Sequence, residues 1–248
     1  MNIAIIPARY HSTRLIGKPL LEIGGIPMII RVCRQVALSK IEKIIVATDD
    51  KRIIDIVINN GFDAIKTQNT HTSGTERCGE VSQILQLKEK DIVINIQGDE
   101  PFIAPESIDL LIDYYNKNNA HNIATLIQTS TNKEHVQNPN RIKVVLNQQN
   151  QALYFSRQAI PFHRKNNSAN FPYNIHNGLY AYDVDTLRKI IALPIHALEL
   201  AEQLEQLRWL ANGFVIQCLT TNTEHLLGID TLEDLKRAEV FITNKERI

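Results

Sequence analysis

The sequence predicts an α/β fold: a mostly parallel central sheet flanked by helices, with a hairpin-bearing subregion in the second half. Two observations support this. Short apolar, β-branched runs alternate with longer segments of helical periodicity in the first half, and two strand-like runs around a polar turn break that order in the second half. No linker-like stretch divides the 248 residues, so we expect a single domain spanning residues 1–248.

The first half consists of successive strand–helix units. The run at residues 2–7 is continuously apolar after Asn2, which suits a central strand covered on both faces. Apolar residues recur at helical spacing from Ile53 to Ile58, with Asp49 or Asp50 as the capping residue. Right-handed connections of this kind place their strands parallel. We expect strands at residues 2–7, 43–48, 63–67 and 91–97, and helices at residues 27–38, after Asp49–Asp50, at residues 73–87 and from Pro105 onward.

The second half has a different pattern. Residues 142–146 and 152–156 flank a polar turn and predict a hairpin. Asp230 and Glu233 resemble an N-cap and its capping-box partner at the start of a final helix. The remaining expectations are a polar loop at residues 165–172, strands at residues 175–182 and 215–219, a short helix after Asp183, and one long helix at residues 196–211 closed by Gly213.

Composition excludes several classes of protein. The chain has 27 Lys plus Arg and 27 Asp plus Glu, and this neutral balance argues against a nucleic-acid-binding protein. No run approaches the roughly 18 apolar residues of a membrane span, and the apolar N-terminal run is shorter than a signal-peptide core. The three cysteines are far apart and form no CxxC pair, which favours reduced thiols in the cytoplasm. The sequence contains no HExxH, GxSxG or Cys/His nucleophile motif.

A cationic loop follows the first predicted strand. Arg9, Arg14 and Lys18 come close after its carboxyl end, the edge at which open α/β sheets bind ligands. Arginine forks and a lysine point charge suit a polyphosphate, although no Walker A or GxGxxG motif is present. The alternative is a solvated basic loop without a ligand. We favour the anion site.

Carboxylates follow other predicted elements. Asp99 follows the strand at residues 91–97 after Gly98, and Asp230 lies far along the chain. Near a polyphosphate such oxygen ligands suit Mg²⁺. The alternatives are a turn residue for Asp99 and a helix N-cap for Asp230, and sequence spacing alone does not decide between them.

Three further polar groups have a structural and a functional interpretation. Ser73 and its neighbours at a predicted helix start could hold an anion or a ribose, or could simply cap the helix. His176 on a half-buried strand is more often structural than catalytic. Glu202, Glu205 and Arg208 recur at helical spacing, which usually indicates an exposed, salt-bridged face.

These residues belong to an ordered series of blocks that runs along nearly the whole chain. The blocks are Ile5-Ile6-Pro7-Ala8-Arg9-x-x-Ser12-Thr13-Arg14-Leu15-x-Gly17-Lys18-Pro19-Leu20, Ala47-Thr48-Asp49-Asp50, His71-x-Ser73-Gly74-Thr75-Glu76-Arg77, Gln97-Gly98-Asp99-Glu100-Pro101, Lys143-Val144-Val145, Ala152-Leu153-Tyr154-Phe155-Ser156-Arg157, His176-x-Gly178-x-Tyr180, Leu204-Glu205-Gln206-Leu207-Arg208 and Gly228-x-Asp230-Thr231. Together they resemble the CMP-Kdo synthetase family, the 3-deoxy-manno-octulosonate (Kdo) cytidylyltransferases.

The resemblance implies a Rossmann-like nucleotidyltransferase fold and a cytoplasmic, homodimeric enzyme of lipopolysaccharide biosynthesis. Such an enzyme joins CTP to Kdo with Mg²⁺ and releases pyrophosphate. Carried over by position, the resemblance implies nucleotide binding by Ala8, Arg9, Arg14, Lys18, Ser73 and Gln97, and sugar binding by Arg77, Gln97, Arg157, His176, Tyr180, Glu205 and Gln206. It implies metal binding by Asp99 and Asp230, and it makes Arg14, Lys18, Asp99 and Asp230 the catalytic set.

One position departs from the family pattern: Ile16 stands where the family usually has proline, so we expect a less rigid loop before Gly17.

Two alternatives remain beside the main interpretation. One is CTP-dependent activation of a related sugar acid, 8-amino-Kdo or sialic acid. The other is a non-catalytic nucleotide-binding module of the same fold.

Overall fold

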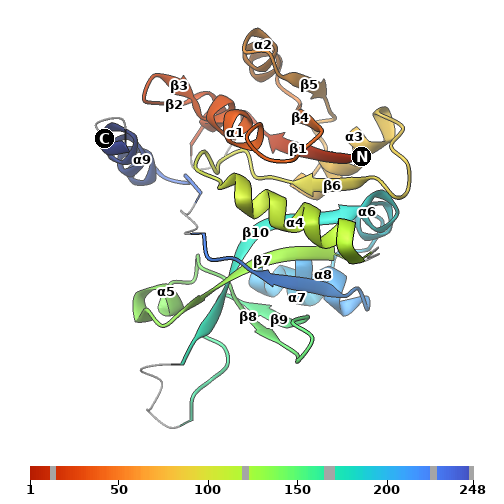
Figure 1. Cartoon of the computed structure of the whole chain (residues 1–248), viewed down its shortest axis with the longest axis vertical. Helices are drawn as coiled ribbons and strands as arrows, with labels where there is room; N and C mark the ends of the chain where they lie inside the picture. Colours follow the sequence, from red (N-terminus) through yellow and green to blue (C-terminus); the bar gives the residue numbers. More distant parts are fainter. Residues whose placement is uncertain (12–14, 119–122, 165–170, 224–227, 246–248) are drawn as a thin grey trace.

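The computed structural model describes residues 1–11, 15–118, 123–164, 171–223 and 228–245. Its main sheet has nine strands, seven of them in the spatial order β11-β7-β10-β6-β1-β4-β5, with β8 and β9 attached to β10 (Figure 1). The strands are β1 (Asn2–Ala8), β4 (Lys43–Thr48), β5 (Asp63–Lys66), β6 (Ile92–Asn95), β7 (Ile123–Ser130), β8 (Lys143–Leu146), β9 (Ala152–Ser156), β10 (Tyr173–Asp183) and β11 (Ile216–Thr220).

Strand directions confirm the predicted parallel arrangement. β1 lies between β6 and β4 and pairs with both in parallel, and β4 pairs with β5 in the same way. On the other side β11 pairs with β7 in parallel. β10 is antiparallel to both β6 and β7, so along the path of seven strands it alone runs against the rest. The carboxyl ends of β1 and β6 therefore meet at one edge.

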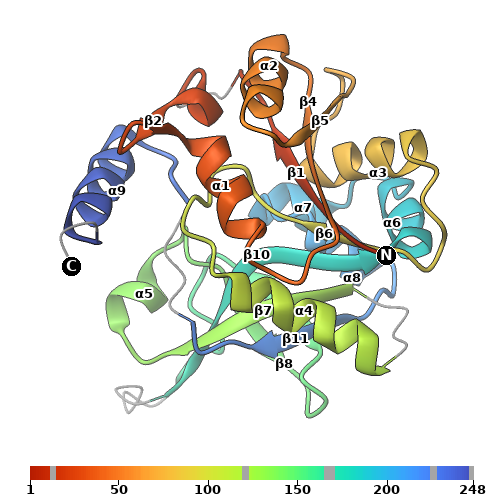
Figure 2. The same cartoon turned by 45° about the horizontal axis from the view of Figure 1, so that its top comes forward.

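Each face of the sheet has its own hydrophobic core. Ile3 and Ile5 point to one face and Ala4 and Ile6 to the other, as the two-residue period of a strand requires. The first core includes buried residues of α3 (Gly74–Ile84), α6 (Val184–Ile191) and α8 (Gln206–Ala211). The second includes residues of α1 (Met28–Val36), α2 (Lys51–Asn59) and α4 (Pro105–Asn118), of which α1 and α4 lie in front of the sheet in Figure 2.

Short polar side chains cap the helices. The Asp50 carboxylate accepts the Arg52 backbone N–H at 2.9 Å. Of the two aspartates considered as the N-cap of α2, Asp50 is therefore the capping residue. The Ser73 hydroxyl caps α3 by accepting the Glu76 N–H at 3.2 Å, and Asp183 caps α6 through Thr186 at 2.7 Å. These caps satisfy backbone donors that the first helical turn leaves unpaired.

The predicted hairpin is also present. β8 and β9 pair antiparallel, and β8 attaches the hairpin to the distal end of β10. The short helix α5 (Lys133–Gln137) lies beside this end of the sheet in Figure 1. The hairpin-bearing subregion is thus an extension of the main sheet through its one long antiparallel strand.

The C-terminal helix α9 (Leu232–Lys245) packs against the segment that follows β1. It contacts a small two-stranded sheet, β2 (Glu22–Ile23) and β3 (Ile26–Pro27), which follows the 3₁₀ turn η1 (Lys18–Leu20). Ile23, Met28 and Ile242 are buried between them. The Glu239 carboxylate accepts the Gly24 N–H at 3.0 and 3.1 Å. This packing brings residues 228–234 close to the segment that carries Lys18.

Three expectations need correction. The helix at residues 196–211 is two helices, α7 (Ala197–Glu202) and α8, because Gln203 adopts a left-handed conformation with φ 53°. The final capping box pairs Thr231 with Asp234, not Asp230 with Glu233: the Thr231 hydroxyl accepts the Asp234 N–H at 3.2 Å, and the Asp234 carboxylate accepts the Thr231 N–H at 2.9 Å. Strand β7 was not predicted, although its alternating β-branched residues are a strand signal. The predicted loop at residues 165–172 lies mostly outside the described residues.

Among the helices described here, none combines the length and the apolar character needed to cross a bilayer.

Candidate functional site

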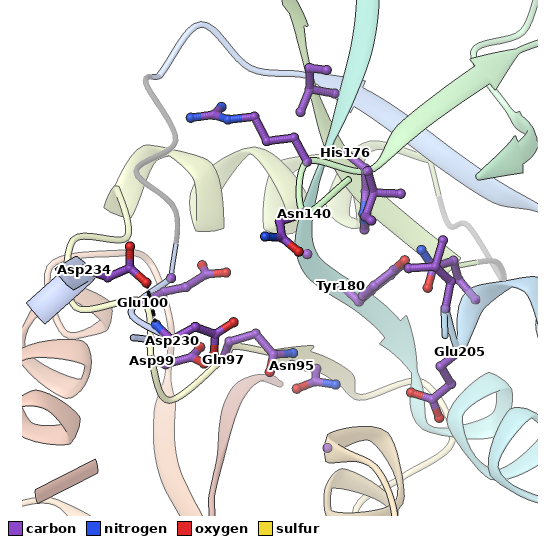
Figure 3. A pocket seen from close by; sticks show the side chains of 18 of the residues that line it. Asn95, Gln97, Asp99, Glu100, Asn140, His176, Tyr180, Glu205, Asp230 and Asp234 are labelled. Atoms are coloured by element: carbon purple, nitrogen blue, oxygen red, sulfur yellow. Dashed lines mark hydrogen bonds between the residues drawn. The ribbon is translucent and has the colours of Figure 1, made fainter. Parts of the chain in front are cut away.

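A cavity of about 610 Å³ opens beyond the carboxyl end of β6 and beside β10. Figure 3 shows two clusters of side chains in it, with Gln97 and Asn95 between them. Asp99, Glu100, Asp230 and Asp234 gather at one end, and Tyr180 and Glu205 face the other. Of the residues proposed from the sequence, the cavity lining contains Gln97, Asp99, His176, Tyr180, Glu205, Gln206 and Asp230.

Lys18 joins the two predicted metal ligands. Its ammonium Nζ lies 2.5 Å from Asp99 Oδ2 and 3.0 Å from Asp230 Oδ1, although these aspartates are 131 positions apart in the chain (230 − 99). Burial alone would lower the pKa of Lys18, but the charges and hydrogen bonds of Asp99 and Asp230 outweigh it and raise that pKa. Lys18 is therefore a stable cation at this end of the cavity.

The backbone explains why the two aspartates meet. The N–H of Ile229 donates to the carbonyl of Asp99 at 2.9 Å, which fixes the chain before α9 against the loop after β6. Thr231 takes the N-cap role expected of Asp230, and the Asp230 carboxylate pairs with Lys18 instead.

Glu100 adds a buried carboxyl beside Asp99. Its side chain is 7% exposed, and no described residue donates a hydrogen bond to Oε2. Burial, helped by the negative charge of Asp99, raises the pKa of Glu100 to about 8. A group of this kind holds its proton near neutral pH and can donate a hydrogen bond.

Glu205 organises the other end of the cavity. It lies at the junction of α7 and α8 and accepts hydrogen bonds from Ser73 Oγ at 3.0 Å and from Thr75 Oγ1 at 2.7 Å. Burial raises the pKa of Glu205 in spite of these bonds and of the positive charge of Arg208, whose Nη2 lies 3.0 Å away. The start of α3 and the start of α8 are thereby linked through one carboxylate.

His176 and Tyr180 lie on β10 and face the same cavity. His176 Nε2 is 2.9 Å from Thr125 Oγ1, and the imidazole packs 5.3 Å from the Tyr180 ring. The Tyr180 hydroxyl is buried without a hydrogen-bond partner among the described residues, and burial raises its pKa well above the usual value. Gln206, at the start of α8, is also buried against the cavity. These groups are placed to hydrogen-bond a polar ligand.

Six predicted residues do not line the cavity: Lys18 and Ser73, whose contacts are given above, and four more. Ala8 is buried at the end of β1. Arg9 donates to the carbonyl of His71. Arg77 is completely buried and pairs with Asp49 at 3.3 Å. Arg157 donates to the carbonyls of Glu202, Pro139 and Gln203 at 2.6, 3.0 and 3.3 Å.

The exposed helix face expected from the spacing of Glu202, Glu205 and Arg208 is absent. They do not form a solvated face: Glu202 accepts the Ser156 hydroxyl at 2.6 Å, Glu205 lines the cavity, and Arg208 is 5% exposed. Arg14, together with Ser12 and Thr13, lies outside the described residues.

Several lining residues had no role predicted from the sequence. Asn95 is 2% exposed, and its Oδ1 accepts no hydrogen bond from any described group. Trp209 Nε1 is buried and donates no hydrogen bond to any described group. A polar residue within the apolar strand at residues 91–97 was the available signal for Asn95. The turn at Asn138, Asn140 and Arg141 carried no comparable signal, because its sequence is typical of any polar loop.

The donor set at Asp99 and Asp230 fits a small, hard cation. Both groups offer carboxylate oxygens, and their shared contact with Lys18 shows that a single positive centre can reach both. Within the described ranges no cluster of three or more His, Cys, Asp or Glu side chains could hold a metal. Two protein carboxylates suffice for Mg²⁺ where substrate phosphates and water supply the other oxygens.

Taken together, the cavity combines a cation and paired carboxylates at one end with a buried hydrogen-bonding surface at the other. Such an arrangement suits the transfer of a phosphoryl or nucleotidyl group onto a polyhydroxylated acceptor, because positioning and charge stabilisation perform most of that chemistry. No covalent nucleophile is required.

Comparisons with known proteins agree with this geometry. A family model described as cytidylyltransferase matches residues 3–234. A 3-deoxy-manno-octulosonate cytidylyltransferase of Fusobacterium nucleatum is 46% identical over 243 residues, covering 97% of this chain and 96% of that protein. Another, of Parabacteroides distasonis, is 45% identical over 251 residues and covers 98% of each.

Solved structures show the same relationship. A CMP:2-keto-3-deoxy-manno-octonic acid synthetase in complex with CTP matches with a TM-score of 0.91 at 39% identity, covering 98% of this chain and 99% of that chain. A cytidylyltransferase of Leptospira borgpetersenii matches with a TM-score of 0.63 at 19% identity, covering 98% and 87%. At that identity the second match shows the fold alone.

Proposed function

Since this chain belongs to the cytidylyltransferase family, we propose that it activates Kdo with CTP and gives CMP-Kdo and pyrophosphate. The observation that carries the proposal is the contact of Lys18 with both Asp99 and Asp230 at one end of a cavity whose other end is a buried hydrogen-bonding surface. The two ends suit the two substrates, a nucleoside triphosphate and a sugar acid.

On the nucleotide side, Arg9, Arg14 and Lys18 would hold the triphosphate, with Ala8 and Ser73 close to the nucleoside. Lys18 is the best supported of these, because its position is fixed by two ion pairs. A lysine ammonium at this place offsets the negative charge that grows on pyrophosphate as it leaves.

Asp99 and Asp230 would hold Mg²⁺. When bound, the ion would screen the phosphate charges and so favour the approach of a nucleophile to the α-phosphorus. The role of this chain's own residues is to keep both carboxylates at one point, through the Ile229–Asp99 backbone hydrogen bond and the packing of α9 on β2 and β3.

On the sugar side, Gln97, His176, Tyr180, Glu205 and Gln206 would bind the hydroxyl groups of Kdo. The anomeric hydroxyl then attacks the α-phosphorus of CTP, its proton leaves, and the bond to pyrophosphate breaks. The hydrogen bond from Ser73 to Glu205 joins the proposed nucleotide and sugar sides, so it helps to hold the two substrates in register.

We further infer a homodimer in the cytoplasm that supplies lipopolysaccharide biosynthesis. Leu153 on β9 and Ile195, Leu198 and Leu200 at α7 are exposed, and hydrogen bonds from Ser156 and Arg157 to Glu202 hold these two elements together. Exposed large apolar side chains on two joined elements would suit a protein partner. The three cysteines are free and buried, in keeping with a reducing compartment.

The test is pyrophosphate release from CTP and Mg²⁺ with Kdo, 8-amino-Kdo and sialic acid in parallel. We expect release with Kdo, its loss in Asp99→Asn, and no loss in Asp113→Asn, which changes an exposed carboxylate paired with Lys40. Activity with sialic acid alone would overturn the substrate assignment. Absence of release with every acceptor would favour a non-catalytic nucleotide-binding module.

A further inference from the structure

A buried asparagine interrupts the apolar run of strand β6. Asn95 is the last residue of β6, after three apolar residues, and its side chain is 2% exposed. The strand register places Asn95 directly opposite Tyr180 of β10, so the two side chains share one face of the sheet. Both residues line the cavity. Asn95 therefore brings a polar group to the cavity from a strand that is otherwise apolar.

Three polar groups at this place have no hydrogen-bond partner among the described residues. They are Asn95 Oδ1, the Tyr180 hydroxyl and Trp209 Nε1, on side chains that are 2%, 7% and 1% exposed. Trp209 packs edge-on against the Tyr180 ring, with the ring centroids 5.1 Å apart. The Tyr182 hydroxyl lies near the Asn95 side chain and is likewise unpaired within the described part of the chain. Because buried polar groups in proteins are normally paired, a cluster of unpaired ones lining a cavity points to a ligand that completes their hydrogen bonds.

Asn95 lies where the two ends of the cavity meet. Figure 3 shows it beside Gln97, between the carboxylates around Asp99 and the two residues Tyr180 and Glu205. In the proposed reaction the acceptor sugar extends from the second end toward the nucleotide at the first. The sugar therefore passes the Asn95 carboxamide.

The chemistry of the cluster suits a neutral hydroxyl group. A carboxamide and a phenol each donate and accept hydrogen bonds, as a hydroxyl does, and an indole N–H donates. None of these groups carries a charge that would offset a buried phosphate or carboxylate. We propose that Asn95 is a specificity-determining residue whose carboxamide hydrogen-bonds a hydroxyl group of the acceptor sugar, with Tyr180 and Trp209 completing the same hydroxyl-binding surface. This inference rests on the proposed function.

The test compares Kdo with a series of analogues that each lack one hydroxyl group. Initial rates of pyrophosphate release with CTP and Mg²⁺ give kcat/KM for wild type, Asn95→Leu, Asn95→Ser and the matched control Asn59→Leu, which changes an exposed asparagine of α2. The analogue without the anomeric hydroxyl cannot react, so its inhibition constant against Kdo is measured instead.

Asn95→Leu should lower kcat/KM for Kdo by roughly five- to fiftyfold, because a sugar hydroxyl is left without its partner in a buried site. The KM for CTP should stay within about twofold, as for independent sites, and Asn59→Leu should match wild type. Asn95→Ser has a shorter side chain that also loses the contact, so it should show the same pattern and serves if Asn95→Leu does not fold.

One analogue should be insensitive to the substitution. For the analogue that lacks the bonded hydroxyl, wild type and Asn95→Leu should differ by no more than about twofold, whereas the other analogues should show the same loss as Kdo. Three results overturn the proposal while wild type remains active: a uniform loss for every analogue, an unchanged kcat/KM for Kdo in both Asn95 variants, or a raised KM for CTP with Kdo unaffected. Wild type inactive with every sugar acid overturns the proposed function and this inference with it.

Discussion

Replacing Lys18 by methionine removes the positive charge that Asp99 and Asp230 share while keeping most of the side-chain volume. Lys18 is 13% exposed, and its Nζ makes contacts of 2.5 and 3.0 Å. In the proposed reaction it also faces the charge that develops on pyrophosphate. One substitution therefore tests both the folding role and the catalytic role of this cation.

The two effects differ in size. Loss of a preorganised charge from a transition state lowers kcat by about 10²- to 10³-fold, or roughly 3 to 4 kcal/mol. The loss in folding stability is smaller, about 1 to 2 kcal/mol, because Asp99 and Asp230 are 26% and 50% exposed and water screens the carboxylates left behind. The variant should therefore fold, with Tm lowered by several degrees.

Steady-state pyrophosphate release, with Kdo varied at saturating CTP, measures kcat and KM separately. We expect kcat to fall and KM for Kdo to stay within a few-fold, since Lys18 does not lie among the sugar-facing side chains. Lys40→Met, which breaks an exposed pair with Asp113, serves as the control. An unchanged kcat, or a rise in KM for Kdo with kcat intact, would refute the role given to Lys18.

Three further predictions concern stability and are measured by urea unfolding without added metal. Burial raises the pKa of Glu100 to about 8 from 4.5, so its contribution to folding stability is present below pH 4.5 and is lost as pH rises toward 8. Relative to Glu100→Gln, the free energy of unfolding of wild type should fall by about 1.4 kcal/mol per pH unit in this window. Parallel pH curves for the two proteins would contradict this. Gly98→Ala places a Cβ 2.8 Å from the Pro7 carbonyl oxygen and should cost about 1 to 3 kcal/mol, whereas a neutral effect would show that the loop yields freely. Arg208→Met leaves Glu205 without its cation and should cost about 3 to 5 kcal/mol, and a cost below about 1 kcal/mol would mean that the pair is not needed for folding.

The sequence was most informative where local signals and tertiary packing agree. Residues 3–7 are apolar at every position, and β1 is indeed covered on both faces. Asp50, Ser73 and Asp183 cap helices because the physics of a helix start is local. The hairpin of β8 and β9 likewise depends on two adjacent runs and the turn between them.

Residues 196–211 show where local reading fails. Helical spacing continues through Gln203, yet the chain breaks there in a left-handed turn that buries Leu204 and directs Glu205 into the cavity. Partners far away in sequence, Ser73 and Thr75, make this arrangement favourable. A charged face that resembled a solvated surface is therefore part of the cavity wall.

The candidate site was predictable only in part for the same reason. The residue types at Asp99 and Asp230 indicated metal chemistry, but their meeting depends on the backbone bond from Ile229 and on how α9 packs. Arg141 had no sequence signal at all, because its place in the cavity comes from Lys143 behind the turn. Sequence indicates which chemistry is available, and the fold decides which groups meet.

The account depends most on a single divalent ion shared by Asp99 and Asp230. Mn²⁺, used as a paramagnetic substitute, can be counted by electron paramagnetic resonance in the presence of CTP for wild type, Asp99→Ala, Asp230→Ala and the double variant. We expect each single variant to weaken the same tight ion, and the double variant to lose no further one. Separate losses that add in the double variant, or full retention in either single variant, would contradict the account.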